Sequence, residues 1–356
     1  MGRMTLNIYE RDAAEFTTLG LGALPDVLSG TVEERRNESI NLEFTYPAGG
    51  KNVDLIQPGR IVTCRANDSD NPQPFRITDV QRPTTDALVI SGQHLALWTL
   101  SSRVITPVQT AAGTGANVIR SIQGAAYGAL GVELSSDITT TGSYKTSLPK
   151  GALEAIVGTE GSFVDVFGGI IHADGLTVKV EAHRGQDRDV TAAYGVNLIS
   201  LDQEQNQARY ATHVFPVWHD VEGGNPVYAP GQELDLGAPA GSVKRTVLVD
   251  LSDEFQNAPT PTQLRDAALR YAADNLIQTP EVTISASFLP LWYSAEYRDK
   301  VEARQIQIGD TITITHRPLG IVGEKHRVVA TTWDICRERY TEIQLGAITR
   351  RLTEMI

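Results

Sequence analysis

The stretch IQPGRIVT, residues 56–63, is matched near the other end of the chain by IQIGDTIT, residues 306–313. In both copies a glycine, Gly59 or Gly309, precedes a run in which apolar and polar residues alternate. A glycine before an alternating run indicates a tight turn that leads into a β-strand. The two copies therefore predict the same turn and strand at two places in the chain.

The match extends beyond the turn, because two further strand patterns follow each copy in the same order. The first carries Arg-Ile or Arg-Val and the second ends in glycine. The matched residues are Arg76 and Arg327 in the first pattern, and Gly92 and Gly346 in the second. Identities are few, and turn-plus-strand patterns also recur by chance. We predict duplication of a small β-barrel domain, with these residues as structural-turn or interface candidates.

Alternation dominates the N-terminal part of the chain, over 39–46, 59–64 and 74–80, with Pro and Gly between the runs. Several short strands separated by turns are typical of an antiparallel β unit that closes up or stacks.

Between about 106 and 200 the pattern changes. Apolar residues at helical spacing predict helices over 116–130 and around 153–157, and strands return at 176–181 and 189–194. This segment reads as a mixed α/β lobe inserted into a β protein.

A longer helix is predicted over 260–277, with Thr260 or Thr262 as its cap and Pro261 in its first turn. The predicted fold class is mainly β, of the α+β type. It comprises two duplicated β-barrel-like domains, an inserted α/β lobe and a small helical peripheral lobe.

Composition predicts a folded, soluble, multi-domain protein, since the 356 residues are 41% hydrophobic and 21% charged. The net charge is −12 and the basic residues are scattered, so a DNA-gripping surface is not expected. No run is long and apolar enough for a membrane span. Cys64 and Cys336 stand far apart and are predicted to be two buried thiols.

Candidate chemistry is weak throughout the sequence. Gly113-Thr114-Gly115 favours a turn into a helix over a phosphate loop, because Val118 replaces the last glycine of the motif. His213 and His219 lack a third ligand at matching spacing, and Ser162 favours a helix cap over a nucleophile. We predict no catalytic residue, no metal and no cofactor.

The segment HRGQDRD, residues 183–189, gathers a histidine, two arginines and two aspartates. Such a cluster could be catalytic or metal-binding, or could be the polar end of a structural element. Strand patterns flank it, and Gly185 suits a positive φ. We predict a solvated hairpin end, with Gly185 and Asp187 as turn or interface candidates.

Four blocks of the sequence, in this order, resemble the tail-associated hub proteins of phages, whose N-terminal structural module is often labelled "prophage endopeptidase tail". The blocks are SGTVEERRNESINLEFTYPAGG (29–50), QPFRITDV (73–80), GSFVDVFGG to SLDQEQ (161–205) and IQIGDTIT to IQLG (306–346). The run from Arg184 to Leu198 is the most specific part. The chain is also similar to the central baseplate hub of contractile-tailed phages.

The resemblance implies a homotrimer in which two barrel-like domains per chain present six similar modules to a six-fold tail tube. It implies a first barrel at 1–105 plus about 200–240, an inserted α/β lobe at 106–199, a second barrel at 241–259 plus 300–350, a peripheral lobe at 260–299 and a tail at 351–356. The implied partners are the distal tail protein ring, the tail tube, the tape-measure protein and a spike, fibre or tip protein.

The resemblance further implies a virion structural protein, made in the host cytoplasm, that gates DNA exit without binding DNA specifically or inserting into a membrane. Longer relatives carry a cell-wall hydrolase beyond the hub, whereas only ten residues follow Gly346 here. We therefore do not expect an enzyme. The alternatives are a tail-associated peptidoglycan hydrolase, a host-receptor-binding module and the hub of a phage-tail-like contractile particle.

Overall fold

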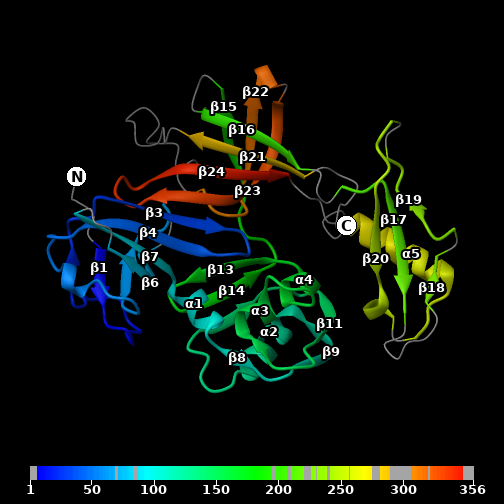
Figure 1. Ribbon diagram of the computed structural model, residues 1–356, viewed down its shortest axis with the longest axis horizontal. Helices are drawn as coiled ribbons and strands as arrows, with labels where there is room; N and C mark the ends of the chain where they lie inside the picture. The colour runs from blue at the N-terminus through cyan, green and yellow to red at the C-terminus, as the bar shows by residue number, and fades with distance from the viewer. Residues whose placement is uncertain are drawn as a thin grey trace. The chain divides into compact units, whose positions relative to one another are not determined.

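A computed structural model describes residues 6–68, 71–82, 86–194, 198–206, 210–219, 226–229, 231–238, 241–255, 257–274, 281–288, 306–319 and 321–347 (Figure 1). These residues form two compact units. The first contains the described residues of Met1–Leu201 and Ser285–Gly346, and the second contains those of Asp202–Ile284 together with Ala347. The chain is mainly β, as the sequence predicts.

Most strands of the first unit belong to one large sheet, and its N-terminal part is built from consecutive antiparallel strands. These are β1 (Leu6–Tyr9), β2 (Gly22–Leu24), β3 (Ser29–Arg35), β4 (Ile40–Pro47), β5 (Ile61–Cys64), β6 (Gln73–Gln81) and β7 (Ala87–His94), with a 3-10 turn at Val53–Leu55. Ile40, Leu42, Phe44 and Tyr46 of β4 are buried, and the residues between them are more exposed. The period-2 pattern therefore packs one face of β4 into the core.

The C-terminal part of the same sheet uses strands from two separate stretches of the chain. These are β15 (Asp187–Ala193), β16 (Leu198–Asn206), β21 (Glu281–Phe288), β22 (Thr311–His316), β23 (Ile321–Asp334) and β24 (Arg339–Ala347), with a 3-10 turn at Arg317–Leu319. Strand β15 pairs with β22 in parallel, and β22 pairs with β23 antiparallel.

The two sets of strands have the same order in the sheet, although β15 runs parallel to β22 whereas β1 runs antiparallel to β5. The first set is ordered β3-β4-β7-β6-β5-β1, and the second is ordered β16-β21-β24-β23-β22-β15. Matched strands also occur in the same order along the chain. We call these sets the first array and the second array. They are joined where β3 pairs with β23, and Figure 1 shows β23 and β24 beside β3 and β4.

The matched turns have the same hydrogen bonds. Gly59 has a φ of 87°, its N–H donates to the Ile77 carbonyl over 2.8 Å, and the Ile77 N–H donates to the Arg60 carbonyl over 2.8 Å. Gly309 has a φ of 91°, its N–H donates to the Val328 carbonyl over 2.9 Å, and the Val328 N–H returns to the Asp310 carbonyl over 2.8 Å. The sequence match therefore marks one turn that is built twice, and the predicted duplication is confirmed.

An α/β lobe lies between the two arrays in the sequence, and Figure 1 shows it in cyan and green. Its helices are α1 (Leu95–Ser101), α2 (Gly115–Gly124), α3 (Ala152–Ile156) and α4 (Phe163–Phe167). Its strands are β8 (Val104–Ile105), β9 (Gln109–Thr114), β10 (Glu133–Ser136), β11 (Thr141–Lys145), β12 (Lys150–Gly151), β13 (Ile170–Asp174) and β14 (Thr177–Glu181). Thr114 caps α2 by accepting from the Asn117 N–H over 3.3 Å, so the glycine-rich segment is a turn into a helix.

The second unit has its own sheet and core. Strand β17 (His213–Trp218) pairs with β18 (Val227–Tyr228), β19 (Leu234–Asp235) and β20 (Thr246–Asp250), and a 3-10 turn follows at Ser252–Glu254. Helix α5 (Pro261–Asp274) packs on β17, and its Leu264 and Ala268 share a buried cluster with Val214 and Trp218.

This grouping differs from the predicted domain boundaries. The sequence joins about 200–240 to the first barrel, whereas the described strands over 213–250 pair with one another. The sequence also starts the second barrel at 241, whereas the second array begins with β15 and β16. Hydrophobic alternation shows that a segment is a strand but does not show which strand it pairs with. The barrel assignments stay a prediction.

Two further predictions concern single features. Cys64 is buried, but Cys336 is exposed, so the prediction of two buried thiols is wrong for Cys336. Within the part of the chain that the structure describes, no helix is both long and apolar enough to cross a bilayer.

Candidate functional site

The HRGQDRD segment connects two different sheets. Strand β14, which precedes it, belongs to the small sheet of the α/β lobe, and β15, which follows it, pairs with β22 of the second array. The prediction of a hairpin end is therefore wrong, because the flanking strands do not pair with each other. The segment lies where the lobe, the first array and the second array meet, and we call this region the junction.

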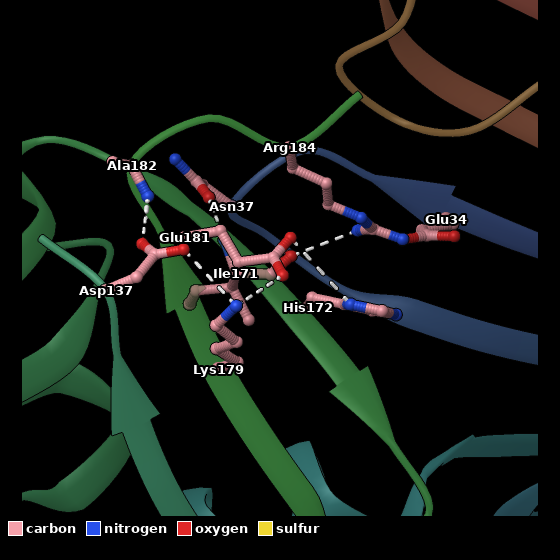
Figure 2. Close-up of polar contacts among 9 residues, drawn as sticks. All are labelled: Glu34, Asn37, Asp137, Ile171, His172, Lys179, Glu181, Ala182 and Arg184. Atoms are coloured by element: carbon pink, nitrogen blue, oxygen red, sulfur yellow. Dashed lines mark hydrogen bonds and ion pairs between the residues drawn. The ribbon is translucent and has the colours of Figure 1, made fainter. Parts of the chain in front are cut away.

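Arg184 is buried at the junction rather than solvated. Its Nη1 lies 2.6 Å from Oε1 of Glu34 on β3 and donates to the Ile171 carbonyl of β13 over 3.1 Å (Figure 2). The side chains of Arg184 and Glu34 are only 4% and 9% exposed. One guanidinium thus links the first array to the lobe in a place that excludes water. Its Nε is also buried and has no hydrogen-bond partner.

Gly185 meets Gly309, the glycine of the second repeated turn. A Cβ on Gly309 would lie 1.9 Å from the Arg184 carbonyl oxygen, and a Cβ on Gly185 would lie 2.2 Å from the Asp310 nitrogen. Both glycines have positive φ, 93° at Gly185 and 91° at Gly309. Two backbones therefore touch at a point where any side chain would push them apart.

Asp310 holds the other end of the segment. Its carboxylate accepts from the Gln186 N–H over 2.7 Å, from Arg188 Nε over 3.0 Å and from the Gln307 N–H over 2.9 Å. The Asp310 side chain is fully buried. Burial of a carboxylate is costly unless its oxygens are satisfied, and these three donors satisfy them. The second array is thereby fixed to the segment.

Asn37, in the turn between β3 and β4, contacts the lobe strand β13, whose Ile171 also binds Arg184. Its side-chain oxygen accepts from the Ile171 N–H over 2.9 Å, and its side-chain nitrogen donates to the Gly169 carbonyl over 3.0 Å. Asn37 has a φ of 57°, a conformation that asparagine tolerates better than most residues. The turn therefore supplies the edge of β13 with both a donor and an acceptor.

More exposed charges surround the junction. Lys179 lies 3.1 Å from Glu181 and 3.2 Å from Asp137, and His172 lies 3.9 Å from Glu181 (Figure 2). The hydrogen bond to Glu181 is the main cause that raises the pKa of Lys179. Burial acts to raise the pKa of Asp137, but the Ala182 N–H and Lys179 together outweigh it and lower that pKa. These groups are already paired with one another.

Asp187 is exposed and forms an ion pair with Lys325 of β23, and His183 is also exposed. The solvated reading thus holds for these two residues but not for Arg184 or Arg188. Across the described residues, no group of three His, Cys, Asp or Glu side chains is placed to hold a metal ion. The geometry of the junction suits the fixing of three parts of the protein in one arrangement.

The other predicted residues lie away from the junction, within the arrays. Arg76 stacks over the Trp98 ring at 4.4 Å and donates to the Gly59 carbonyl over 2.5 Å, and burial lowers its pKa. Its counterpart Arg327 pairs with Thr311 in the strand register. Gly92 pairs with Leu42 and Ile77. Gly346 lies in β24, where an added Cβ would be 2.8 Å from Val329.

Sequence reasoning missed Glu34, Asn37, Ile171 and Asp310. One signal for Asp310 was present, because an aspartate stands where the first repeat has Arg60. A charge change at a matched position indicates that one copy meets something that the other does not.

A second buried polar link joins the first array to the lobe. His94 Nε2 lies 3.1 Å from Gln73 Oε1, and Gln73 Nε2 donates to Asp174 Oδ1 over 2.8 Å. The Gly175 N–H also donates to Gln73 Oε1, over 2.9 Å. His94 is fully buried, which lowers its pKa to about 4. It is therefore a neutral structural histidine at physiological pH.

Comparison with solved structures gives matches over nearly the whole chain. A prophage tail protein, gp18, from Listeria monocytogenes EGD-e has a TM-score of 0.61 at 13% identity, covering 99% of this chain and 97% of the other. A tail protein from Neisseria meningitidis MC58 has 0.61 at 12% identity, covering 98% and 97%. The 43 kDa tail protein of prophage MuSo2 from Shewanella oneidensis has 0.60 at 9% identity, covering 97% and 98%.

No protein-family model matches the chain, and no curated protein sequence matches it. At these identities the structural matches establish the fold. The chain therefore has the fold of these tail proteins from end to end.

Proposed function

We propose that this chain is a virion structural protein, the trimeric hub at the distal tip or baseplate of a phage tail. The observation that carries the proposal is a fold shared over almost the full length with three tail proteins. The duplicated array supports it further, because a closed trimer can match a six-fold tube only if each chain carries the binding module twice.

In this role the protein works by shape. It joins the distal tail ring and the tail tube on one side to a spike, fibre or tip protein on the other. The closed ring retains the end of the tape-measure protein until DNA leaves. The buried pairs at the junction suit such a part, because they hold both arrays and the lobe in one geometry. A net charge of −12 favours a conduit with little affinity for DNA.

The oligomeric state tests the trimer. Native mass measurement of the purified protein should give three times the 38.7 kDa of one chain. A chain that stays monomeric both in solution at high concentration and in assembled particles would contradict the proposal.

Position in the particle is a separate test. An epitope label on the protein should appear by electron microscopy at the distal end of the tail. Zymography on peptidoglycan should show no clearing by the purified protein, and reproducible clearing would favour the hydrolase alternative instead.

A further inference from the structure

The joint between the two arrays is an edge-to-edge strand pair. Strand β3 pairs antiparallel with β23, in a register from Arg35 opposite Ala330 to Thr31 opposite Asp334. The Arg36 N–H donates to the Val329 carbonyl over 2.8 Å, beside the point where β22 stops pairing with β23. One edge of β23 thus pairs with β22 over its first half and with β3 over its second half.

The matched strand in the first array is β6, and the matching edge of β6 is uncovered. Strand β5 pairs with β6 only from Gln73 to Arg76, and among the described residues no strand pairs with that edge from Thr78 to Gln81. Thr78, Asp79 and Gln81 are exposed. In β23, by contrast, Ala330 and Thr331 are only 4% and 3% exposed under β3.

The strand that matches β3 in the second array is β16, and its outer edge is also uncovered among the described strands. Strand β16 holds the place in the second array that β3 holds in the first, because each is the outermost strand beside β4 or β21. Strand β3 uses its outer edge for β23. In the described part of the chain β16 pairs on one side with β21, and its remaining pairing is an isolated bridge from Leu198 to Tyr194.

We infer that the outer edge of β16 in one chain pairs antiparallel with the Thr78–Gln81 edge of β6 in a second copy of the chain. The inference rests on the proposed function, for which it names the contact between subunits. The template is the joint within one chain, where β3 pairs with β23. Strand β16 matches β3, and β6 matches β23, so β16 and β6 of different chains would form the same kind of joint. Edge strands that expose unpaired backbone groups are sites for strand addition.

A closed ring would then contain two joints of this kind for each chain. Each chain contributes one internal joint, one donor edge and one acceptor edge, which is a head-to-tail contact. A ring of three chains would contain three internal and three intersubunit joints. The two arrays of every chain would then hold equivalent places around the ring.

Backbone alternation identifies the residue of β6 to change. The Val329 carbonyl points at β3, and alternate residues of a strand direct their backbone groups to the same side, so Thr331 also faces β3. The repeat aligns Ile77 with Val328, so the residue matching Thr331 is Val80. Ile77 faces β5, and a register shift between Ile77 and Asp79 resets the alternation, so that Val80 faces the same outer edge. Val80→Pro removes the N–H at that place, and Val80→Ala keeps it.

Native mass measurement of both variants tests the joint. We expect Val80→Ala to remain a trimer at concentrations where Val80→Pro is a monomer with an unchanged circular dichroism spectrum. A folded trimer of Val80→Pro would overturn the inference while leaving the proposed hub intact. A wild-type monomer that persists into assembled particles would instead remove the trimer on which both rest.

Disulfide trapping tests the donor strand directly and does not depend on the proline variant. Gln81→Cys, which matches Thr332, is combined with a cysteine at each position from Ser200 to Glu204 in turn, in a Cys336→Ser background. One pairing should give a disulfide between different chains on a non-reducing gel. The pair Glu33→Cys with Thr332→Cys, opposite each other in the internal joint, is the control and should cross-link within one chain.

Failure of every β16 position to cross-link in a protein that is trimeric would overturn the strand assignment. A disulfide formed within a single chain would overturn it as well.

Discussion

Arg184 and Glu34 form an ion pair that water hardly reaches, with side chains 4% and 9% exposed. Removing two charges from water is costly, and the loss is recovered only when partners are close and well oriented. The Nη1–Oε1 distance of 2.6 Å and the bond to the Ile171 carbonyl meet that condition. Deleting one partner therefore costs much more than deleting one member of an exposed pair.

Arg184→Ala should lower the free energy of unfolding of the first unit by about 3–5 kcal/mol, because Glu34 is left buried without its cation. Asp187→Ala is the matched control, since its ion pair with Lys325 is exposed and should contribute less than about 1 kcal/mol. Urea unfolding followed by circular dichroism measures both. Equal losses in the two variants would show that the junction does not depend on the buried pair.

Substitutions at Gly59 and Gly309 distinguish the cost of backbone strain from the cost of steric contact. Both have positive φ in the same turn, but a Cβ on Gly59 would meet only the Arg11 side chain at 3.5 Å, whereas one on Gly309 would meet backbone at 1.9 Å. Gly59→Ala should cost about 1–2 kcal/mol from the left-handed conformation alone. Gly309→Ala should cost about 2–5 kcal/mol, because the same backbone strain is joined by the cost of moving the segment away from the new side chain. Thermal unfolding measures both variants, and a loss of stability in Gly59→Ala as large as that in Gly309→Ala would contradict this prediction.

His94 predicts a fall in stability at acidic pH. Burial is the main cause that lowers its pKa from 6.5 to about 4, Asp174 opposes the shift, and His172 adds to it. Above pH 6.5 the folded and unfolded chains both hold it neutral. Between pH 6.5 and 4 only the unfolded chain takes up the proton, so stability falls as pH falls, by up to about 3 kcal/mol in total.

His94→Gln should flatten the pH dependence of the unfolding free energy in that window, because the glutamine cannot be protonated. The measurement is a series of urea unfolding curves from pH 8 to pH 4, with the wild-type protein beside the variant. If the unfolding free energies of the wild-type protein and the variant change with pH in parallel over the whole range, His94 is excluded as a source of the acid sensitivity.

At the scale of elements, the hairpin of β3 and β4 makes three contacts, through its turn, through one buried carboxylate and through the outer edge of β3. Its turn residue Asn37 binds β13, Glu34 binds Arg184, and the outer edge of β3 binds β23. One short hairpin therefore carries the lobe and the second array together. The exposed side chains around it do not show this, because the contacts are made by its turn, its backbone and one buried carboxylate.

Helix α5 begins with a capping box that fixes the choice between Thr260 and Thr262. The Gln263 N–H donates to Thr260 Oγ1 over 3.3 Å, and Gln263 Oε1 accepts from the Thr260 N–H over 2.9 Å. Thr260→Ala should destabilise the second unit by about 0.5–2 kcal/mol. Thr262→Ala is the control and should be neutral or slightly stabilising, because alanine favours a helix. Urea unfolding that ranks the two in the opposite order would refute the assigned cap.

At the scale of the whole molecule, the two arrays repeat one strand order, and the chain interrupts the second array with the second unit. Strands β16 and β21 are neighbours in the sheet although the β17–β20 sheet and α5 separate them in sequence. The repeat in sequence covers only the last three strands of each array. The earlier strands are matched in space by their pairing partners.

The sequence by itself determined the strands, the repeated turn and the start of α5, because alternation, glycine and capping residues act over a few neighbouring positions. It placed Gly59, Gly309 and the order of the matched strands correctly. It also marked HRGQDRD as unusual, but not where the segment lies.

Only the tertiary structure decided that Arg184 is buried, that Arg188 is largely covered beside Asp310 and that β3 pairs with β23. It also decided that the strands over 213–250 pair with one another. Glu34 and Arg184, or Arg188 and Asp310, are far apart in the chain, and whether a charge is solvated depends on what covers it. Pairing and burial are properties of the assembled fold, so no local pattern of residues fixes them.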